Sequence, residues 1–205
     1  MKIPSSSIPR LSLYYRALIQ AKDINVISSQ ELAELAGSNA AQVRKDLAYF
    51  GQFGTPGRGY SIKVLKDELK NILGIDREWN VSLVGVGNLG SALLAYKGFK
   101  DQGFKIVCAF DNDKKKIGKV REGIKIEDIK DLNRIVRAKR IGMAIVAVSG
   151  GNAQDTINRL VSSGVMAILN FAPIRPKVSK TVKILNIDLS IELEKLTYFL
   201  KRINL

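Results

Sequence analysis

The sequence contains no histidine, and cysteine occurs only once among its 205 residues, as Cys108. Histidine is the commonest general acid or base in enzymes and the commonest ligand of transition metals. Its absence therefore argues against acid–base catalysis and against a transition-metal site. A single cysteine excludes an internal disulfide and a cysteine-based metal cluster, and its apolar surroundings, IVCAF, favour a packed thiol over a reactive one. We expect neither a catalytic residue nor a metal site.

Long apolar runs are absent as well. No stretch reaches the roughly 18 consecutive apolar residues of a membrane-spanning helix. The first residues, MKIPSSSIPRL, lack the apolar centre of a signal peptide. We therefore expect a cytoplasmic protein with no membrane partner.

Acidic residues are scarce relative to basic ones. Lysine and arginine together number 33, aspartate and glutamate 19, and the formal net charge is +14. Such a charge attracts polyanions, of which nucleic acid is the commonest, although a solvated lysine-rich surface is the alternative interpretation. The apolar share of 46% is ordinary for a globular protein with a core.

The sequence divides into three parts by pattern. Residues 1–78 show helical periodicity and one glycine-rich turn, whereas residues 79–186 alternate β-rich apolar runs with helical stretches. Residues 187–205 have the pattern of a terminal helix. A length of 205 residues allows two small domains.

Two helices joined by a short turn follow a first helix that is expected over Leu11–Gln20. Ser28 and Glu31 have the spacing of a capping box, so the second helix begins there, and Gly37 can end it. Ser38 and Asn39 are both good N-caps for a third helix. This arrangement predicts a helix-turn-helix, whose second helix enters the major groove of DNA.

Val43, Leu47 and Phe50 share one face of the third helix, which leaves polar side chains free on the other faces. The segment that follows, GQFGTPGRGY, is rich enough in glycine to predict a tight hairpin, which after a recognition helix is a wing. The predicted DNA-binding residues lie on these elements: Ser38, Gln42, Arg44, Lys45 and Arg58.

The second part opens with an apolar run, VSLVGVGNLGSALLAY, that contains Gly85-x-Gly87-x-x-Gly90 between a strand and a helix. In this context the three glycines allow a tight turn, a close approach of a pyrophosphate and close packing of the helix on the strand. Asp111 follows Gly90 by about 20 residues at the end of another strand, where an acid binds the ribose hydroxyls of NAD(H). The pattern predicts a Rossmann domain that binds NAD(H).

Two further apolar runs, MAIVAVS and VMAILNF, predict core strands on either side of a helix over about residues 154–163. Ligands of such sheets bind at the carboxyl ends of the strands, so the ends of these strands are expected to line the nicotinamide side, although simple packing of the strand ends fits the pattern equally well. The predicted cofactor-binding residues are Gly85, Val86, Gly87, Asn88, Leu89, Gly90, Asp111, Val148, Ser149 and Asn170.

The terminal helix, expected over Ile191–Leu205, has an apolar stripe that needs a partner. Its own domain and a second subunit are equally compatible with this stripe. The stripe consists of Ile191, Leu196, Phe199, Leu200 and Ile203.

Nearly the whole sequence resembles the Rex family of redox-sensing repressors. The resemblance is carried by IPRL at residues 8–11, QVRKDL at 42–47, GQFG at 51–54 with Gly59-Tyr60, the glycine fingerprint, Asp111, and NFAP at 170–173. It implies a homodimer that binds a palindromic operator when NADH is scarce and releases it when NADH rises.

The resemblance also implies that residues 187–205 are exchanged between subunits. It further implies a redox switch in which Asp188 contacts Tyr96 in one state and Arg16 in the other. The predicted fold is therefore α/β, with an N-terminal winged helix, a Rossmann domain and a swapped C-terminal helix.

Two other classes fit parts of the pattern. An NAD-dependent oxidoreductase fits the fingerprint, but it needs a proton donor and a substrate domain, and the sequence has no histidine and little length left. A nucleotide- or CoA-binding module without DNA function fits the second part alone, and the helix-turn-helix with its wing argues against it.

Overall fold

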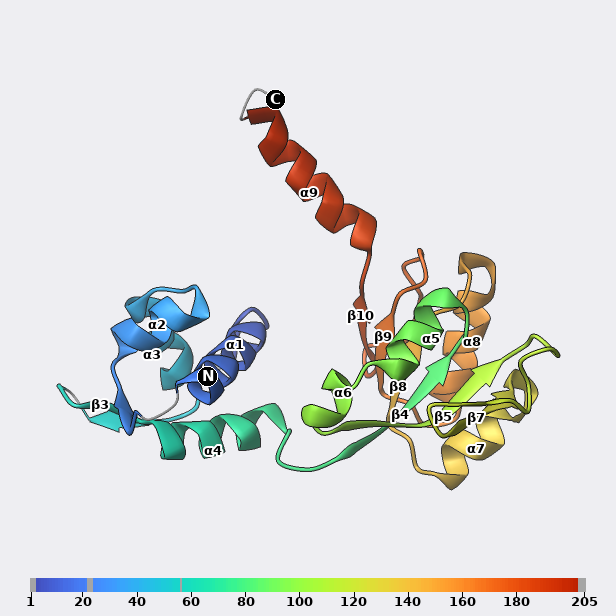
Figure 1. Ribbon diagram of the computed structural model, residues 1–205, viewed down its shortest axis with the longest axis horizontal. Helices are drawn as coiled ribbons and strands as arrows, with labels where there is room; N and C mark the ends of the chain where they lie inside the picture. Colours follow the sequence, from blue (N-terminus) through green and yellow to red (C-terminus); the bar gives the residue numbers. More distant parts are fainter. Residues whose placement is uncertain (1–2, 22–23, 56, 203–205) are drawn as a thin grey trace. The chain divides into compact units, whose positions relative to one another are not determined.

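The computed structural model describes residues 3–21, 24–55 and 57–202. Contacts within the chain define two compact units, Met1–Glu78 and Trp79–Leu205 (Figure 1). None of the helices in these described ranges is both long and apolar enough to cross a membrane.

The first unit is a winged helix. Three short strands form an antiparallel sheet in the order β1-β3-β2, beside a helical bundle. Its elements are α1 (Ser7–Gln20), β1 (Val26–Ile27), α2 (Ser29–Ala36), α3 (Ala40–Ala48), β2 (Gly54–Thr55), β3 (Gly59–Ser61) and α4 (Ile62–Leu73). The predicted winged-helix fold is confirmed.

Local capping sets the ends of α2 and α3. The predicted capping box is present: the backbone N–H of Glu31 donates to Ser28 Oγ at 3.1 Å, and that of Ser28 donates to Glu31 Oε2 at 2.8 Å. Gly37 ends α2 with a φ of 63°, in the left-handed region that glycine tolerates best. The Asn39 side chain accepts from the backbone of Gln42 at 2.9 Å and starts α3.

The start of α1 differs from the prediction. The helix begins at Ser7 rather than Leu11, and Pro9 lies inside its first turn. Proline is tolerated there because the first N–H groups of a helix have no partner within the helix. The helix α4 was not predicted, and it adds Ile62, Leu65 and Leu69 to the core of this unit.

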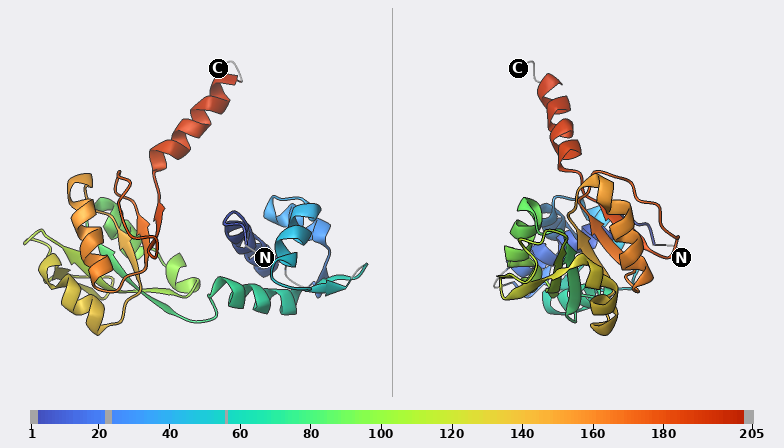
Figure 2. Two further views of the ribbon diagram at one scale, coloured as in Figure 1. Left: turned by 180° about the vertical axis from the view of Figure 1, so that it is seen from behind. Right: turned by 90° about the vertical axis from the view of Figure 1, so that its right-hand side faces the viewer.

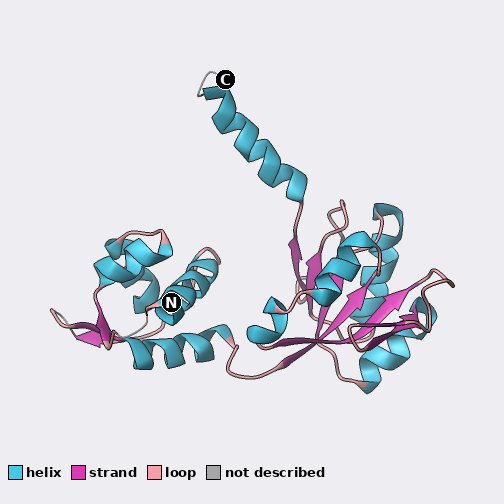
Figure 3. Ribbon diagram, viewed as in Figure 1, coloured by secondary structure: helices cyan, strands magenta, loops and turns pink. Residues whose placement is uncertain are grey.

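The second unit is a Rossmann fold. Its seven-stranded sheet has the order β10-β9-β8-β4-β5-β7-β6 and is parallel except for the terminal hairpin of β6 with β7 (Figure 3). Its elements are β4 (Trp79–Val84), α5 (Asn88–Ala95), α6 (Gly98–Asp101), β5 (Phe104–Asp111), β6 (Val120–Arg121), β7 (Ile124–Asp128), η1 (Ile129–Asp131), α7 (Leu132–Ala138), β8 (Met143–Val146), α8 (Gly150–Ser162), β9 (Ala167–Asn170), β10 (Lys183–Asn186) and α9 (Leu189–Arg202).

Both faces of the sheet are buried. Val84 and Phe110 pack with α7 and α8 on one face, whereas Leu83 and Ala109 pack toward α5 and α6 on the other. In Figure 2, α5 (green) and α8 (orange) flank the sheet on opposite sides. The chain runs outward from β4 to β5 and β7, then returns to β8 on the other side of β4. Sheets of this type bind ligands at such a reversal, outside the carboxyl ends of the strands, which here are those of β4 and β8.

Two helices of this unit differ from their predicted bounds. The helix α8 begins at Gly150, four residues or so before the predicted start, because the Ser149-Gly-Gly-Asn segment gives no apolar signal. The helix α9 covers Leu189–Arg202 and has no buried residue. Of its predicted stripe, Leu196, Phe199 and Leu200 are each about half exposed, and Ile203 lies outside the described residues.

Cys108 lies in the core of the sheet with 2% of its surface exposed. Burial raises the pKa of its thiol to about 12, so the reactive thiolate is scarce at neutral pH. We expect iodoacetamide at pH 7.5 to leave the folded protein unmodified and to alkylate Cys108 only after denaturation, as mass spectrometry would show. Rapid alkylation of the folded protein would contradict this and would make a thiol-based response possible.

Candidate functional site

The glycine fingerprint forms the turn between β4 and α5. Gly85 has a φ of 93°, and a Cβ placed there would lie 2.4 Å from the carbonyl oxygen of Ala147. A Cβ at Gly90 would lie 1.8 Å from the carbonyl oxygen of Gly85. A Cβ at Gly87, by contrast, would meet nothing within 4 Å. The lack of a side chain at Gly85 and Gly90 therefore allows backbone segments to pack closely there. At Gly87 the space next to the backbone is open.

This open space lies at the N-terminus of α5. Gly87 is the N-cap of the helix and supplies no side-chain cap, and Gly87, Asn88 and Leu89 are exposed. The first N–H groups of a helix lack partners within it and carry the positive end of its dipole. A phosphate can approach these groups closely because residue 87 has no side chain.

Asp111 closes the turn from the neighbouring strand. Its carboxylate accepts from the backbone of Val86 at 2.8 Å and of Asp113 at 2.9 Å, and from Lys116 Nζ at 3.1 Å. Burial acts to raise its pKa, but these hydrogen bonds outweigh burial and leave the pKa below its ordinary value. Asp111 is thus ionised at neutral pH, and since a carboxylate offers about four acceptor positions, it can accept one further hydrogen bond from a sugar hydroxyl.

The other predicted cofactor-binding residues lie at the ends of β8 and β9. Val148 contacts the position of Gly85, because a Cβ there would be 2.9 Å from Val148 Cγ1, and Ser149 is the exposed N-cap of α8. Asn170 is fully buried, and its side chain donates to the carbonyl oxygen of Ala172 at 3.1 Å and to Asn186 Oδ1 at 2.9 Å. Its side chain therefore holds its own loop, and its backbone carbonyl accepts from the N–H of Ile187 at 2.8 Å.

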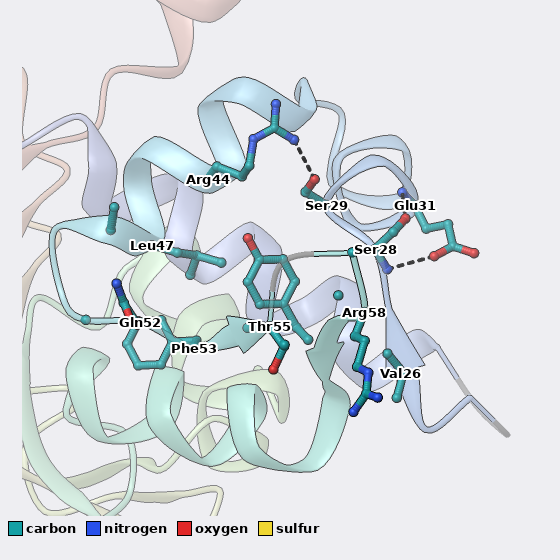
Figure 4. Close-up of a pocket in the computed structure, with 16 residues that line it drawn as sticks. Val26, Ser28, Ser29, Glu31, Arg44, Leu47, Gln52, Phe53, Thr55 and Arg58 are labelled. Carbon is teal, nitrogen blue, oxygen red and sulfur yellow. Dashed lines mark hydrogen bonds between the residues drawn. The ribbon is translucent and has the colours of Figure 1, made fainter.

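The winged helix contains a hollow of about 690 Å³ between α2, α3 and the wing. Arg44 and Arg58 lie on opposite sides of it (Figure 4). Arg44 donates to Ser29 Oγ at 2.7 Å, which holds its guanidinium beside the start of α2. Lys45 is exposed on α3, and Ser38 is half-buried just before the helix. The hollow is thus flanked by cations, as a groove that receives a DNA backbone would be.

A buried carboxylate that the sequence did not reveal anchors α3. Asp46 is fully buried and accepts from Arg10 Nη2 at 2.7 Å, Ser7 Oγ at 2.8 Å and Tyr14 Oη at 2.9 Å. Gln42 Nε2 also donates to it at 3.0 Å. The sequence offered one hint of this burial. Asp46 lies on the same helical face as the apolar residues Val43 and Leu47.

The three residues of the predicted switch are exposed on separate elements. Arg16 lies on α1, and Tyr96 ends α5, where its ring packs edge-on against Phe99 with centroids 5.0 Å apart. Asp188 precedes α9 and accepts from the backbone of Ser190 at 3.0 Å. Exposure leaves all three side chains accessible to a partner, and their pairing stays a prediction.

The fold and these sites define the class of the protein: a winged helix with a cationic groove, joined in one chain to a Rossmann domain whose glycine turn is open to a phosphate. Proteins of this class combine a fold for nucleic-acid binding with a fold for nucleotide ligands.

Comparisons with known proteins narrow this class to one family. A family model described as a CoA binding domain matches residues 76–174, and one described as a putative DNA-binding protein N-terminus matches residues 2–48. A protein of Carboxydothermus hydrogenoformans named redox-sensing transcriptional repressor Rex is 47% identical over 203 residues, which is 98% of each chain. The chain belongs to the Rex family of redox-sensing transcriptional repressors.

Two solved structures of the Rex-family repressor RSP are also similar to this chain. RSP in complex with β-NAD+ and operator DNA has a TM-score of 0.94 and 35% identity, with 100% of this chain and 95% of that chain covered. RSP in complex with β-NADH has a TM-score of 0.89 and 33% identity, with 100% and 97% covered. The predicted family and the predicted fold, a winged helix with a Rossmann domain, are thus confirmed.

Proposed function

We propose that this protein is a redox-sensing transcriptional repressor that binds palindromic operator DNA and is released when NADH rises relative to NAD+. One observation carries the proposal: a single chain holds a recognition helix with a cationic groove and an open glycine turn beside an ionised aspartate. The complexes of RSP with β-NAD+ and operator DNA and with β-NADH support it.

NAD(H) is the ligand that the Rossmann site fits best. The N-terminus of α5 and the space above Gly87 receive the pyrophosphate, and Asp111 accepts from a ribose hydroxyl. Val148 and Ser149 lie beside the turn, on the nicotinamide side. The neutral reduced nicotinamide suits an apolar pocket better than the cationic ring of NAD+ does.

The DNA-binding surface consists of α3 and the wing. Arg44, Lys45 and Arg58 supply positive charge toward phosphates, while Ser38 and Gln42 flank the start of the helix that enters the major groove. Phosphate contacts set the affinity and its salt dependence, and base contacts set the sequence preference.

A population shift between two arrangements of a dimer links the two sites. NADH must bind the arrangement that cannot hold DNA more tightly than the other, because a ligand with equal affinity for both shifts nothing. Asp188 is the switching group, paired with Tyr96 in one arrangement and with Arg16 in the other. No catalytic step is required, and a cytoplasmic location follows from this role.

The exposed helix α9 is the dimerisation element in this proposal. Its apolar side chains have no cover in the described chain, and a second copy that exchanges the same helix would cover them. Deletion of residues 187–205 is expected to convert a dimer into a monomer in light scattering. The monomer should bind a full palindrome at least about 10-fold more weakly, because one half-site is left without its protein. A truncated chain that remains dimeric would contradict this role.

The proposed function is tested by fluorescence anisotropy of a palindromic operator at fixed salt, titrated separately with NADH, NAD+ and CoA. Release by NADH at concentrations where NAD+ and CoA have little effect is the expected result. Equal effects of NADH and NAD+ would overturn redox sensing, and the absence of operator binding would overturn the repressor. A parallel assay for turnover of NADH with simple carbonyl compounds is expected to show none, whereas turnover would favour the oxidoreductase.

A further inference from the structure

Gln42 has an amide whose orientation is dictated by its neighbour. Its Nε2 lies 3.0 Å from Oδ1 of Asp46, one turn later on α3. Asp46 is fully buried, and Arg10, Ser7 and Tyr14 also donate to it. With four donors around it, this carboxyl has a pKa of about 2 despite its burial and is ionised at neutral pH.

An ionised carboxylate accepts hydrogen bonds and donates none. The nitrogen of the Gln42 amide, rather than its oxygen, must therefore face Asp46. One N–H of Gln42 is used in this contact, which leaves Oε1 and the second N–H. Within residues 3–21, 24–55 and 57–202, no side chain or backbone donor reaches Oε1 of Gln42.

The free half of the amide is well placed for base contact. Gln42 is the third residue of α3, and its side chain is partly exposed. The N-terminal residues of the second helix of a helix-turn-helix are those that reach base edges in the major groove. Gln42 thus presents one acceptor and one donor, side by side, at the end of α3 that faces the bases.

We propose that Gln42 reads an adenine in each operator half-site and that Asp46 is the positioning residue that fixes which side of the Gln42 amide faces the base. Adenine presents an N6 donor beside an N7 acceptor in the major groove, which matches the free acceptor and donor of the amide. Guanine presents two acceptors, thymine a lone acceptor with a methyl group, and cytosine a lone donor, so each satisfies at most one of the two groups. This inference rests on the proposed function, because it requires an operator.

The test uses the full-length protein and an operator selected by it from a randomised pool of duplexes. Each adenine of a half-site is replaced in turn by 7-deaza-adenine, which lacks the N7 acceptor, and by purine, which lacks the N6 amino group. For the unaltered protein, both replacements are expected to weaken binding about 10-fold at one position. Gln42→Ala should lose sensitivity at that position and keep the remaining sensitivities.

Gln30→Ala is the matched control. Gln30 lies on α2, and its amide also donates to a carboxylate one turn later, Glu34 Oε1 at 2.8 Å. Its loss should leave the map of sensitive adenines unchanged. Asp46→Asn replaces an acceptor by a group that also donates, so the Gln42 amide can turn over, and discrimination at the same adenine should fall several-fold. Gln42→Ala tests the base contact by itself, even where Asp46→Asn fails to fold, and Asp46→Asn tests the positioning role.

Two results would overturn the inference while leaving the repressor intact. One is an operator on which no adenine loses its effect in Gln42→Ala. The other is a uniform loss of affinity for every operator variant in Gln42→Ala, which would assign Gln42 a purely structural role. A protein that selects no DNA from the pool would instead overturn the proposed function, and the base contact with it.

Discussion

Gly87→Ala is expected to abolish the response to NADH while the protein stays folded. A Cβ at this position meets no protein atom within 4 Å, and its φ of −79° is one that alanine adopts freely, so the substitution costs the fold little. In the proposed function, the same Cβ would occupy the space through which the pyrophosphate reaches the first N–H groups of α5. Loss of two charge-assisted hydrogen bonds, at about 1.5 kcal/mol each, weakens NADH binding at least about 100-fold.

Calorimetric titration with NADH measures this loss, and operator anisotropy measures its consequence. The Gly87→Ala variant should bind the operator as tightly as the unaltered protein does. It should also stay bound to the operator at NADH concentrations that release the unaltered protein. Gly142→Ala is a matched control, because a Cβ there also meets nothing within 4 Å and the residue precedes β8 at the opposite, amino edge of the sheet. Unchanged NADH affinity in Gly87→Ala would show that the pyrophosphate does not bind at this turn.

Asp46→Ala is expected to destabilise the winged helix by about 3 kcal/mol, because breaking a buried ion pair leaves its partner uncompensated. Arg10, whose pKa is raised mainly by its hydrogen bond to Asp46, would lose that partner, and Ser7 and Tyr14 would lose their acceptor. Urea unfolding followed by circular dichroism measures the change. Asp67→Ala, at an exposed position of α4, should change stability by less than about 0.5 kcal/mol.

The contribution of Asp46 should also depend on pH. Burial acts to raise its pKa, but the hydrogen bonds from its neighbours, led by Arg10, hold it at about 2 against an ordinary value of 3.8. A carboxyl with a depressed pKa in the folded state stabilises that state by about 2 kcal/mol above pH 4 or so, and this contribution is lost as the pH falls toward 2. The stability difference between the unaltered protein and Asp46→Asn should therefore shrink over this range, and a constant difference would contradict the ion pair.

Several elements could be predicted from the sequence because their signals are local. The capping box of Ser28 and Glu31, the cap at Asn39 and the glycine at position 37 each act on residues within about one helical turn. The glycine fingerprint is equally local. Its position between an apolar run and a helical pattern predicts the turn that connects β4 to α5.

Other features had no sequence signal of their own. The strand β1 has two residues, too few for an alternating pattern, and it exists because Ile27 pairs with Tyr60 of β3. Asn170 was predicted to face the ligand from its place at a strand end, but its side chain turns inward to Ala172 and Asn186. The direction of a side chain at a strand end depends on neighbours that periodicity does not reveal.

The winged helix, the Rossmann fold and the open glycine turn could all be predicted from local patterns, because caps, turns and periodic apolar faces are interactions between residues close along the chain. The folded structure, in contrast, makes Asp46 a buried anchor, since its partner Arg10 lies 36 residues away. It likewise decided that Gly85 must lack a side chain because β8 brings Ala147 against it. Such contacts form only when the chain has folded, because folding alone brings distant residues together and removes water from between them.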